Sequence, residues 1–147
     1  MNRIEVARRR MLPSKWEEAT MQQRIVVVED EPEMLDIVCV NLEQSGYRVV
    51  PARDGVEAYE ALEKEVPDAV ILDLNLPNMS GFRLLKLLRR DARLSRVPLI
   101  VATAFAFEEV EDIANEGIDC FMTKPFDPAE LVIGLEYVLS KADGATI

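Results

Sequence analysis

Polar side chains that could bind a divalent cation follow four separate apolar runs of the chain. They are Glu29 and Asp30 after residues 24–28, Asp73 after 69–72, Thr103 at the end of 99–103, and Lys124 after 120–123. Three carboxylates with a hydroxyl and an ammonium suit a hard cation with oxygen ligands, and Mg²⁺ is the abundant one that also accepts a phosphoryl oxygen. These residue types therefore predict a Mg²⁺ site.

The absent residue types narrow the chemistry further. The chain has 147 residues and no histidine, which excludes Ser-His-Asp and Cys-His catalysis, histidine-ligated zinc and a phosphohistidine on this chain. The two cysteines, Cys39 and Cys120, lie far apart in apolar contexts without CxxC spacing, so we predict reduced, buried core residues. Any reaction of this protein must therefore use carboxylates, hydroxyls and lysine as its reacting side chains.

The charge balance limits the partners. Asp and Glu total 27 against 17 Lys and Arg, a formal net charge of -10, which repels nucleic acid and anionic membranes. No apolar run suits a signal peptide or a membrane span. We therefore expect a cytoplasmic protein with no direct nucleic-acid or membrane partner.

The site residues need elements that bring them together, and the sequence predicts five strand and helix pairs. Short runs rich in β-branched residues predict strands at 24–29, 47–51, 69–73, 99–103 and 120–123. Segments of helical period predict helices at 32–44, 56–64, 80–90, 107–115 and 128–141. This alternation, with central strands apolar on both faces, predicts an α/β, doubly wound parallel sheet covered by helices on both faces.

The ends of the chain lie outside this repeating pattern. Residues 1–20 hold five basic and three acidic residues and precede the first apolar run. We predict that 1–20 are a basic, dispensable extension rather than a docking tail, and that 21–147 form one domain. Few residues follow the last helix, so we expect no fused output domain.

In an open parallel sheet, ligands bind outside the carboxyl ends of the strands, at the switch point of the strand order. The three carboxylates, the hydroxyl and the ammonium all stand at such ends, so we expect them to converge on one edge. Three like charges brought together repel one another and raise their proton affinity unless a cation compensates. A set of merely solvated strand ends is therefore the weaker interpretation.

These residues, with their neighbours, resemble the receiver domain of two-component response regulators, of the chemotaxis-regulator-like single-domain type. The motifs are VVEDEP at 27–32, LDLNLPNMSG at 72–81, TA at 103–104 and KPF at 124–126. Four motifs in this order on the expected strands are far more specific than any one of them. The resemblance covers about residues 24–142 and implies a flavodoxin-like, five-stranded sheet of order 2-1-3-4-5.

The resemblance also implies roles for individual residues. Asp73 would be the phosphoacceptor, attacking the phosphohistidine of a sensor histidine kinase or histidine phosphotransfer protein. With Asp73, Asp30 would bind Mg²⁺ directly and Glu29 either directly or through a water molecule. Asn75 would add its backbone carbonyl. Glu29 stands where aspartate is common in the family, so we expect altered metal geometry.

The remaining family residues would bind the phosphoryl group and transmit its presence. Lys124 would pair with phosphoryl oxygens, and Thr103 would donate its hydroxyl to one of them. Thr103 and Phe121 would form the conformational switch. A downstream protein partner would bind the face of the fourth helix, fifth strand and last helix, where Phe105, Phe107 and Tyr137 are candidates for an apolar patch.

Several alternatives stay open on the sequence alone. The chain, as a monomer or weak homodimer, could signal in trans, could be a phosphorelay intermediate that passes phosphate to a histidine phosphotransfer protein, or could be a receiver fragment of a longer regulator. In each case it is a signalling protein rather than an enzyme. A degenerate receiver would have lost an acid or the lysine, and a phosphatase of the haloacid dehalogenase type would need a second aspartate at position 75, where Asn75 stands.

Overall fold

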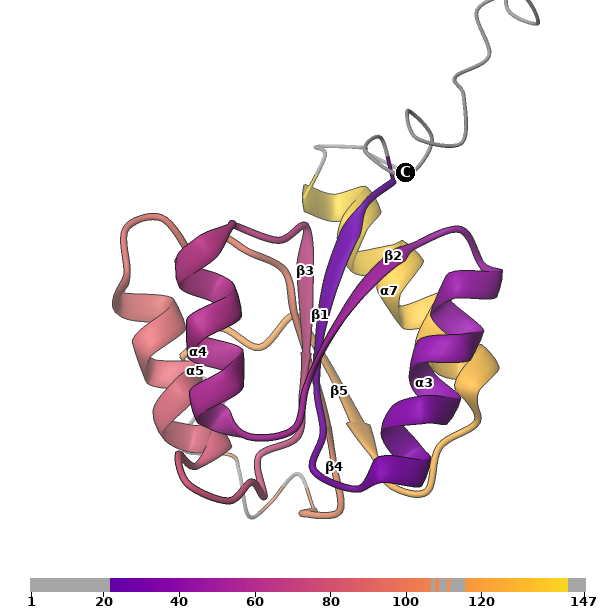
Figure 1. Cartoon of the computed structure of the whole chain (residues 1–147), viewed down its shortest axis with the longest axis horizontal. Helices are drawn as coiled ribbons and strands as arrows, with labels where there is room; N and C mark the ends of the chain where they lie inside the picture. Colours follow the sequence, from indigo (N-terminus) through magenta and orange to yellow (C-terminus); the bar gives the residue numbers. More distant parts are fainter. Residues whose placement is uncertain (1–21, 107, 109–110, 112–115, 143–147) are drawn as a thin grey trace, which may run out of the picture.

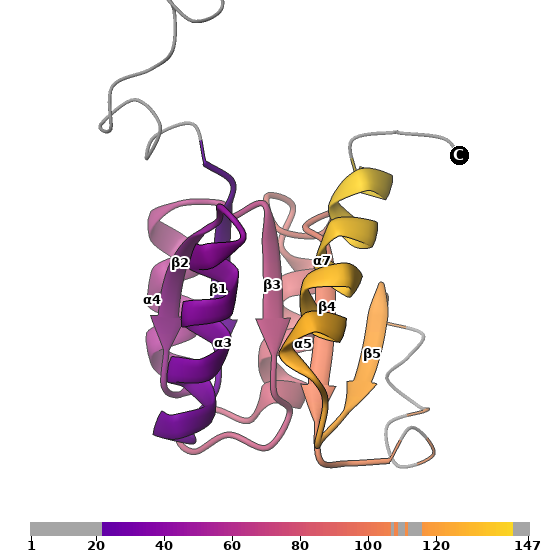
Figure 2. The same ribbon diagram turned by 90° about the vertical axis from the view of Figure 1, so that its right-hand side faces the viewer.

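The protein is described by a computed structural model, in which residues 22–106, 108, 111 and 116–142 are placed. Five parallel strands form one sheet of order β2-β1-β3-β4-β5, which confirms the predicted fold class and order. The strands are β1 (Arg24–Val28), β2 (Arg48–Ala52), β3 (Ala69–Leu72), β4 (Leu99–Thr103) and β5 (Cys120–Thr123). All strand arrows point to the same edge of the sheet (Figure 2).

The three central strands are buried along their whole length, whereas the edge strands β2 and β5 are partly exposed. Strands buried on both faces need side chains that pack above and below the sheet, and the Val and Ile residues of β1, β3 and β4 supply them. Burial of the three central strands therefore explains their apolar composition, as the sequence indicated.

Helices cover both faces of the sheet. They are α3 (Pro32–Gln44), α4 (Gly55–Lys64), α5 (Gly81–Arg90) and α7 (Pro128–Ala142). Ser80 caps α5 by accepting a hydrogen bond from the Arg83 backbone N–H, and Asp54 caps α4 by accepting one from the backbone N–H of Glu57. Pro32 opens α3 in its first turn.

The sheet separates two apolar cores (Figure 1). Helices α4 and α5 pack on one face, where Leu62, Leu84 and Val101 are buried. Helices α3 and α7 pack on the other, where Leu42 and Leu135 are buried. This three-layer arrangement leaves the strand ends as the place where polar side chains from different strands can meet.

Two predictions about single residues need correction. Cys39 and Cys120 are free, as predicted, but half-buried rather than fully buried, because each packs at the margin of the α3 and α7 core. Phe105 is half-buried rather than exposed, because its ring packs against Phe82, with ring centroids 5.8 Å apart. Tyr137 is exposed as predicted.

Some predictions fall on residues that the structure does not describe. The extension 1–20 and Phe107 lie outside the described residues, as does most of the predicted helix 107–115. Within the described part of the chain, every helix is too short or too polar to cross a lipid bilayer. The Lys124–Pro125 peptide bond is cis.

Candidate functional site

The polar residues that the sequence singled out meet at the carboxyl edge of the sheet. Glu29 and Asp30 follow β1, and Asp73 follows the neighbouring strand β3. Thr103 ends β4, and Lys124 follows the edge strand β5. Strand order places β1, β3, β4 and β5 side by side, so the predicted convergence on one edge is confirmed.

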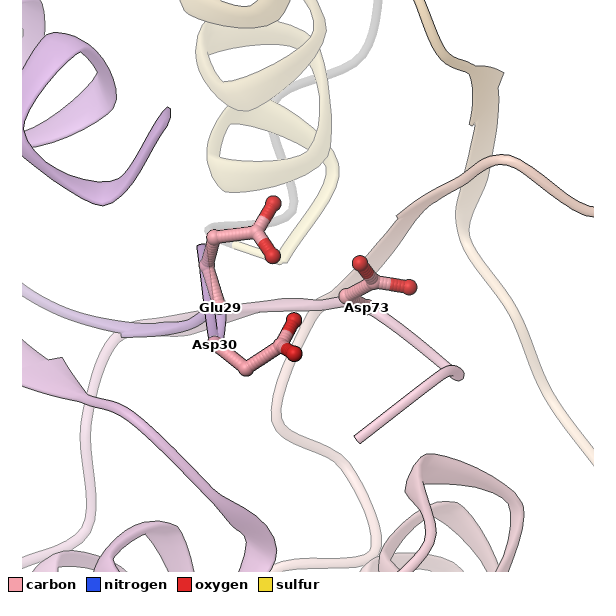
Figure 3. A group of neighbouring side chains, drawn as sticks. All are labelled: Glu29, Asp30 and Asp73. Atoms are coloured by element: carbon pink, nitrogen blue, oxygen red, sulfur yellow. The ribbon is translucent and has the colours of Figure 1, made fainter. Parts of the chain in front are cut away.

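Three carboxylates form the centre of the site (Figure 3). One oxygen from each of Glu29, Asp30 and Asp73 lies within 4.8 Å of the others. Glu29 and Asp73 are only 4% and 5% exposed, whereas Asp30 faces solvent. The cluster therefore consists of two buried carboxylates and one carboxylate that is exposed to solvent.

Both oxygens of Asp73 accept hydrogen bonds. The Thr103 hydroxyl donates to Oδ1 at 2.9 Å, and the Asn75 backbone N–H donates to the same oxygen at 3.0 Å. The Lys124 ammonium donates to Oδ2 at 2.7 Å. These contacts hold the Asp73 carboxylate in one orientation at the end of β3.

Lys124 also donates to Glu29 Oε1, so one ammonium bridges the two buried carboxylates. Burial raises the pKa of Glu29 to about 7, against the lowering effect of Lys124. Burial lowers the pKa of Lys124, but its hydrogen bonds and attraction to Asp73 and Glu29 outweigh this, and the net shift is upward. The lysine therefore stays charged at neutral pH.

The donor set fits a hard divalent cation. All three clustered side chains offer carboxylate oxygens, and neither a thiol nor an imidazole belongs to the cluster. When all are ionised, three negative charges face the single positive charge of Lys124, which leaves a net negative site. Glu29, Asp30 and Asp73 are therefore the described residues that could hold Mg²⁺.

The two residues of the predicted switch lie on neighbouring strands. The Thr103 side chain is fully buried, and its Oγ1 is 3.4 Å from the backbone N–H nitrogen of Phe105, which donates to it. Phe121 on β5 pairs in register with Val101 on β4 and packs against the α4 and α5 core. Since Val101 and Thr103 point to the same face of the sheet, Phe121 shares that face with the Thr103 hydroxyl.

Two features of the site escaped the sequence analysis. The Glu29–Lys124 contact depends on a bridging ammonium, and no spacing in the sequence indicates it. The loop that follows Asp73 is tied to the start of α4 by a hydrogen bond from the Asn78 side chain to Asp54. Asn78 has a positive φ, and an asparagine in a turn is the signal in the sequence that could have pointed to this contact.

Comparison with known proteins agrees with this geometry. Residues 25–136 match the response regulator receiver domain family. The phosphate regulon transcriptional regulatory protein PhoB of Klebsiella pneumoniae is 40% identical over 122 residues, which are 82% of this chain and 53% of that protein. The alkaline phosphatase synthesis transcriptional regulatory protein PhoP of Bacillus subtilis is 35% identical over 123 residues, or 84% of this chain and 51% of that protein. The chain thus spans about half the length of the curated relatives it matches.

Solved structures show the same fold. The chemotaxis response regulator CheY4 of Vibrio cholerae superposes with a TM-score of 0.76 at 28% identity, covering 80% of this chain and 99% of that one. A CheY-like receiver domain protein of Methanospirillum hungatei superposes with a TM-score of 0.78 at 27% identity, covering 85% and 99%. The motifs, the strand order and the family match lead to one conclusion: this chain belongs to the response regulator receiver domain family of two-component signal transduction.

Proposed function

We propose that the chain is a phosphoacceptor that takes a phosphoryl group onto Asp73 from the phosphohistidine of a sensor histidine kinase or a histidine phosphotransfer protein. The supporting observation is the buried, oriented carboxylate of Asp73, held by Thr103 and Lys124 beside two further carboxylates. We expect this exchange to take place in the cytoplasm.

The proposed reaction is a phosphoryl transfer. An oxygen of Asp73 attacks the phosphorus atom, the P–N bond of the donor breaks, and its electron pair stays on the imidazole nitrogen of the partner. The product is an acyl phosphate on this chain. Mg²⁺ bound by Glu29, Asp30 and Asp73, with the Asn75 carbonyl as a further proposed ligand, would neutralise phosphoryl charge.

The chain's own residues prepare Asp73 for this role. Lys124 donates a hydrogen bond to one oxygen of the Asp73 carboxylate, and Thr103 donates to the other. Each is therefore placed to bind an oxygen of the arriving phosphoryl group. Transfer through a loose transition state depends on positioning and charge neutralisation more than on acid-base chemistry. A site without histidine or thiol is sufficient for it.

Acetyl phosphate with Mg²⁺ tests the proposal directly. We expect intact mass to increase by one phosphoryl group that is labile as an acyl phosphate, and Asp73→Asn to abolish the increase. Asp36→Asn, which changes an exposed aspartate of α3, is the matched control and should be phosphorylated normally. A mass increase that persists in Asp73→Asn, or release of phosphate from an unrelated phosphomonoester, would contradict the assignment.

We propose that Thr103 and Phe121 transmit phosphorylation of Asp73 to the surface of the domain. When the Thr103 hydroxyl turns to a phosphoryl oxygen, Phe121 on the same face of the sheet follows by packing, and the surface of β5 and α7 changes its affinity for a protein partner. Ile133 and Tyr137 are exposed on α7 and are candidates for that contact.

Amide hydrogen exchange tests this route. Thr103→Ala should still accept phosphate but should lose most of the phosphorylation-dependent exchange change at Phe105 and Phe121. Thr123→Ala, which removes an exposed threonine from the neighbouring strand, should keep it. Equal exchange changes in wild type and Thr103→Ala would rule out this coupling.

The similarity to transcriptional regulators supports a second candidate, control of transcription by the phosphorylated receiver. The matched relatives carry that function in their names, and this chain corresponds to about half of each. That these residues contact no nucleic acid directly stays a prediction, based on their acidity. Retardation of duplex DNA by the phosphorylated chain at low salt would contradict it.

A further inference from the structure

The loop between β3 and α5, residues 73–80, is tied to the start of α4 by one carboxylate. Asn78 Nδ2 donates to Asp54 Oδ2 at 2.8 Å. The other oxygen of the same carboxylate, Asp54 Oδ1, accepts from the backbone N–H of Glu57 at 2.8 Å and caps α4. The two oxygens therefore have separate tasks, one within α4 and one toward the loop that follows the phosphoacceptor.

Backbone contact reinforces this tie. A Cβ atom added at Gly55 would lie 2.2 Å from the Met79 carbonyl oxygen, so only glycine allows the start of α4 to approach the loop this closely. Asn78, next to Met79, has a φ of 67°, in the left-handed region that asparagine tolerates better than most residues. Gly55 and Asn78 are thus residue types suited to the close contact between α4 and the loop.

The loop transmits its position to Asp73 because its two ends are in contact. A Cβ atom at Gly81 would lie 2.4 Å from the Asp73 carbonyl oxygen, and the Gly81 N–H donates to the Leu74 carbonyl at 3.1 Å. Within the loop, the Asn75 N–H donates to Asp73 Oδ1. Because of these close contacts, a displacement of residues 78–79 is expected to shift residues 73–75 as well.

We propose that Asp54 and Asn78 are positioning residues of the phosphoacceptor site: their hydrogen bond, called here the loop clamp, holds residues 73–80 in the arrangement that binds the divalent cation. The inference rests on the proposed function of Asp73. Neither residue touches the carboxylate cluster, so the clamp acts through the backbone. The lowered pKa of Asp54, caused first by the Glu57 N–H and then by Asn78, agrees with a carboxylate that is ionised when it accepts both bonds.

Two substitutions separate the clamp from a simple effect of charge. Asn78→Asp places a second carboxylate against Asp54 and breaks the bond, so we expect the Mg²⁺ dissociation constant to rise about fivefold. Charge alone predicts the opposite, because an added negative charge attracts the cation. Asp54→Asn, which still offers an oxygen to α4 and can pair with the Asn78 amide, should leave the dissociation constant within about twofold of wild type.

The double variant Asp54→Asn/Asn78→Asp is the rescue experiment. The amide introduced at position 54 can donate to the carboxylate introduced at position 78, which restores the clamp with reversed donor and acceptor. We expect the Mg²⁺ affinity to return to within about twofold of wild type. Glu57→Gln is the matched control: it removes one charge at the start of α4 without touching Asn78 and should not change Mg²⁺ affinity.

The readouts are the Mg²⁺ dissociation constant, from amide chemical shifts during titration with Mg²⁺ alone, and the rate of phosphorylation by acetyl phosphate. At saturating Mg²⁺, Asn78→Asp should reach the wild-type rate, because the clamp sets cation affinity rather than the chemical step. Melting temperatures close to wild type would exclude general unfolding as the cause. If Asn78→Asp does not fold, Asn78→Gly, which permits the positive φ but lacks the amide, should show the same weakening.

The outcomes distinguish the clamp from the proposed function. A wild type that shows no Mg²⁺ response, or is not phosphorylated on Asp73, overturns the proposed function and the clamp with it. A wild type that responds normally, with Asn78→Asp and Asn78→Gly at its dissociation constant or below, overturns the clamp alone. Failure of the double variant to recover affinity also overturns the clamp.

Discussion

The edge of the sheet at which the strands begin and the edge at which they end differ in how their charged side chains are paired. At the amino edge, arginine side chains donate to backbone carbonyls, and each forms an ion pair with a single carboxylate. At the carboxyl edge, three carboxylates share one ammonium. The first arrangement pairs each charge with nearby acceptors, and the second leaves a surplus of negative charge that a cation must balance.

Arg89 shows how complete the pairing is at the amino edge. From the last turn of α5, its guanidinium donates to the Gly117 carbonyl through Nε and Nη2, at 2.9 and 2.6 Å. It also donates to the carbonyls of Ser95 and Val97 at 3.1 and 2.7 Å and to Asp119 at 3.1 Å. All five N–H donors of this guanidinium are thus directed at acceptors near the starts of β4 and β5.

Arg24 has a similar role at the start of β1. Its Nη1 donates to the Glu65 carbonyl just after α4, at 2.8 Å, and its backbone N–H donates to Asp68 at 2.7 Å. The first bond satisfies a carbonyl that the end of α4 leaves without an intrahelical donor, and the second satisfies the backbone N–H at the start of β1. The amino edge therefore stabilises the fold, whereas the carboxyl edge gives up stability to keep a reactive carboxylate and its neighbours together.

The largest expected effect comes from the amino edge. Arg89→Met keeps much of the side-chain volume but removes the guanidinium donors from three carbonyls and from Asp119, which keeps only the Leu99 N–H. We therefore expect a loss of about 3 kcal/mol in the free energy of unfolding. Phosphorylation of Asp73 below the melting temperature should not change. Chemical denaturation and the acetyl phosphate assay measure the two quantities.

Arg90→Met is the matched control for that substitution. The neighbouring arginine has a side chain 71% exposed and a single ion pair with Glu116 at 3.8 Å. Its removal should cost less than about 1 kcal/mol. Equal destabilisation by both substitutions would mean that the guanidinium contacts of Arg89 do not stabilise the amino edge.

The sequence predicted the carboxyl edge and not the amino edge, and the reason is physical. Site residues stand directly after apolar strands, and the parallel topology alone brings such positions to one edge. The Arg89 contacts join a helix end to loops far along the chain, and their acceptors are backbone carbonyls, which every residue has. No residue type therefore marks these contacts in advance.

The strands and helices were predictable for a related reason. β4 and β5 have the predicted bounds, and α3 runs from Pro32 to Gln44 as predicted, because proline and the Ser45-Gly46 pair mark its ends. The strands before the acids end one residue earlier than expected, at Val28 and Leu72, since Glu29 and Asp73 turn away into the site. The loop clamp and the Glu29–Lys124 contact required coordinates, because each depends on side-chain geometry between distant segments.

The next largest effect concerns Lys124, whose ammonium bridges two carboxylates of the cluster. Lys124→Met removes the ammonium that bridges Glu29 and Asp73, which are both buried, so without metal we expect a loss of about 2 kcal/mol in the free energy of unfolding. Mg²⁺ should recover more stability in this variant than in wild type, because more negative charge is uncompensated. Melting with EDTA and with Mg²⁺ measures the difference, and equal Mg²⁺ responses would contradict the charge argument. Lys141→Met, which changes a lysine at the end of α7, is the control.

The smallest and most discriminating effect concerns Asp30, the exposed carboxylate of the cluster. Removing this carboxylate relieves repulsion and also removes a proposed metal ligand. In EDTA we therefore expect Asp30→Ala to melt at a higher temperature than wild type, with a free energy of unfolding about 0.5 kcal/mol larger. Wild type should gain about 1.4 kcal/mol at a Mg²⁺ concentration ten times its dissociation constant, and the variant should gain little. The order of the two melting temperatures should therefore reverse when Mg²⁺ replaces EDTA. Asp36→Ala, which removes an exposed aspartate from α3, should show no reversal, and an undiminished Mg²⁺ response in Asp30→Ala would remove Asp30 from the metal site.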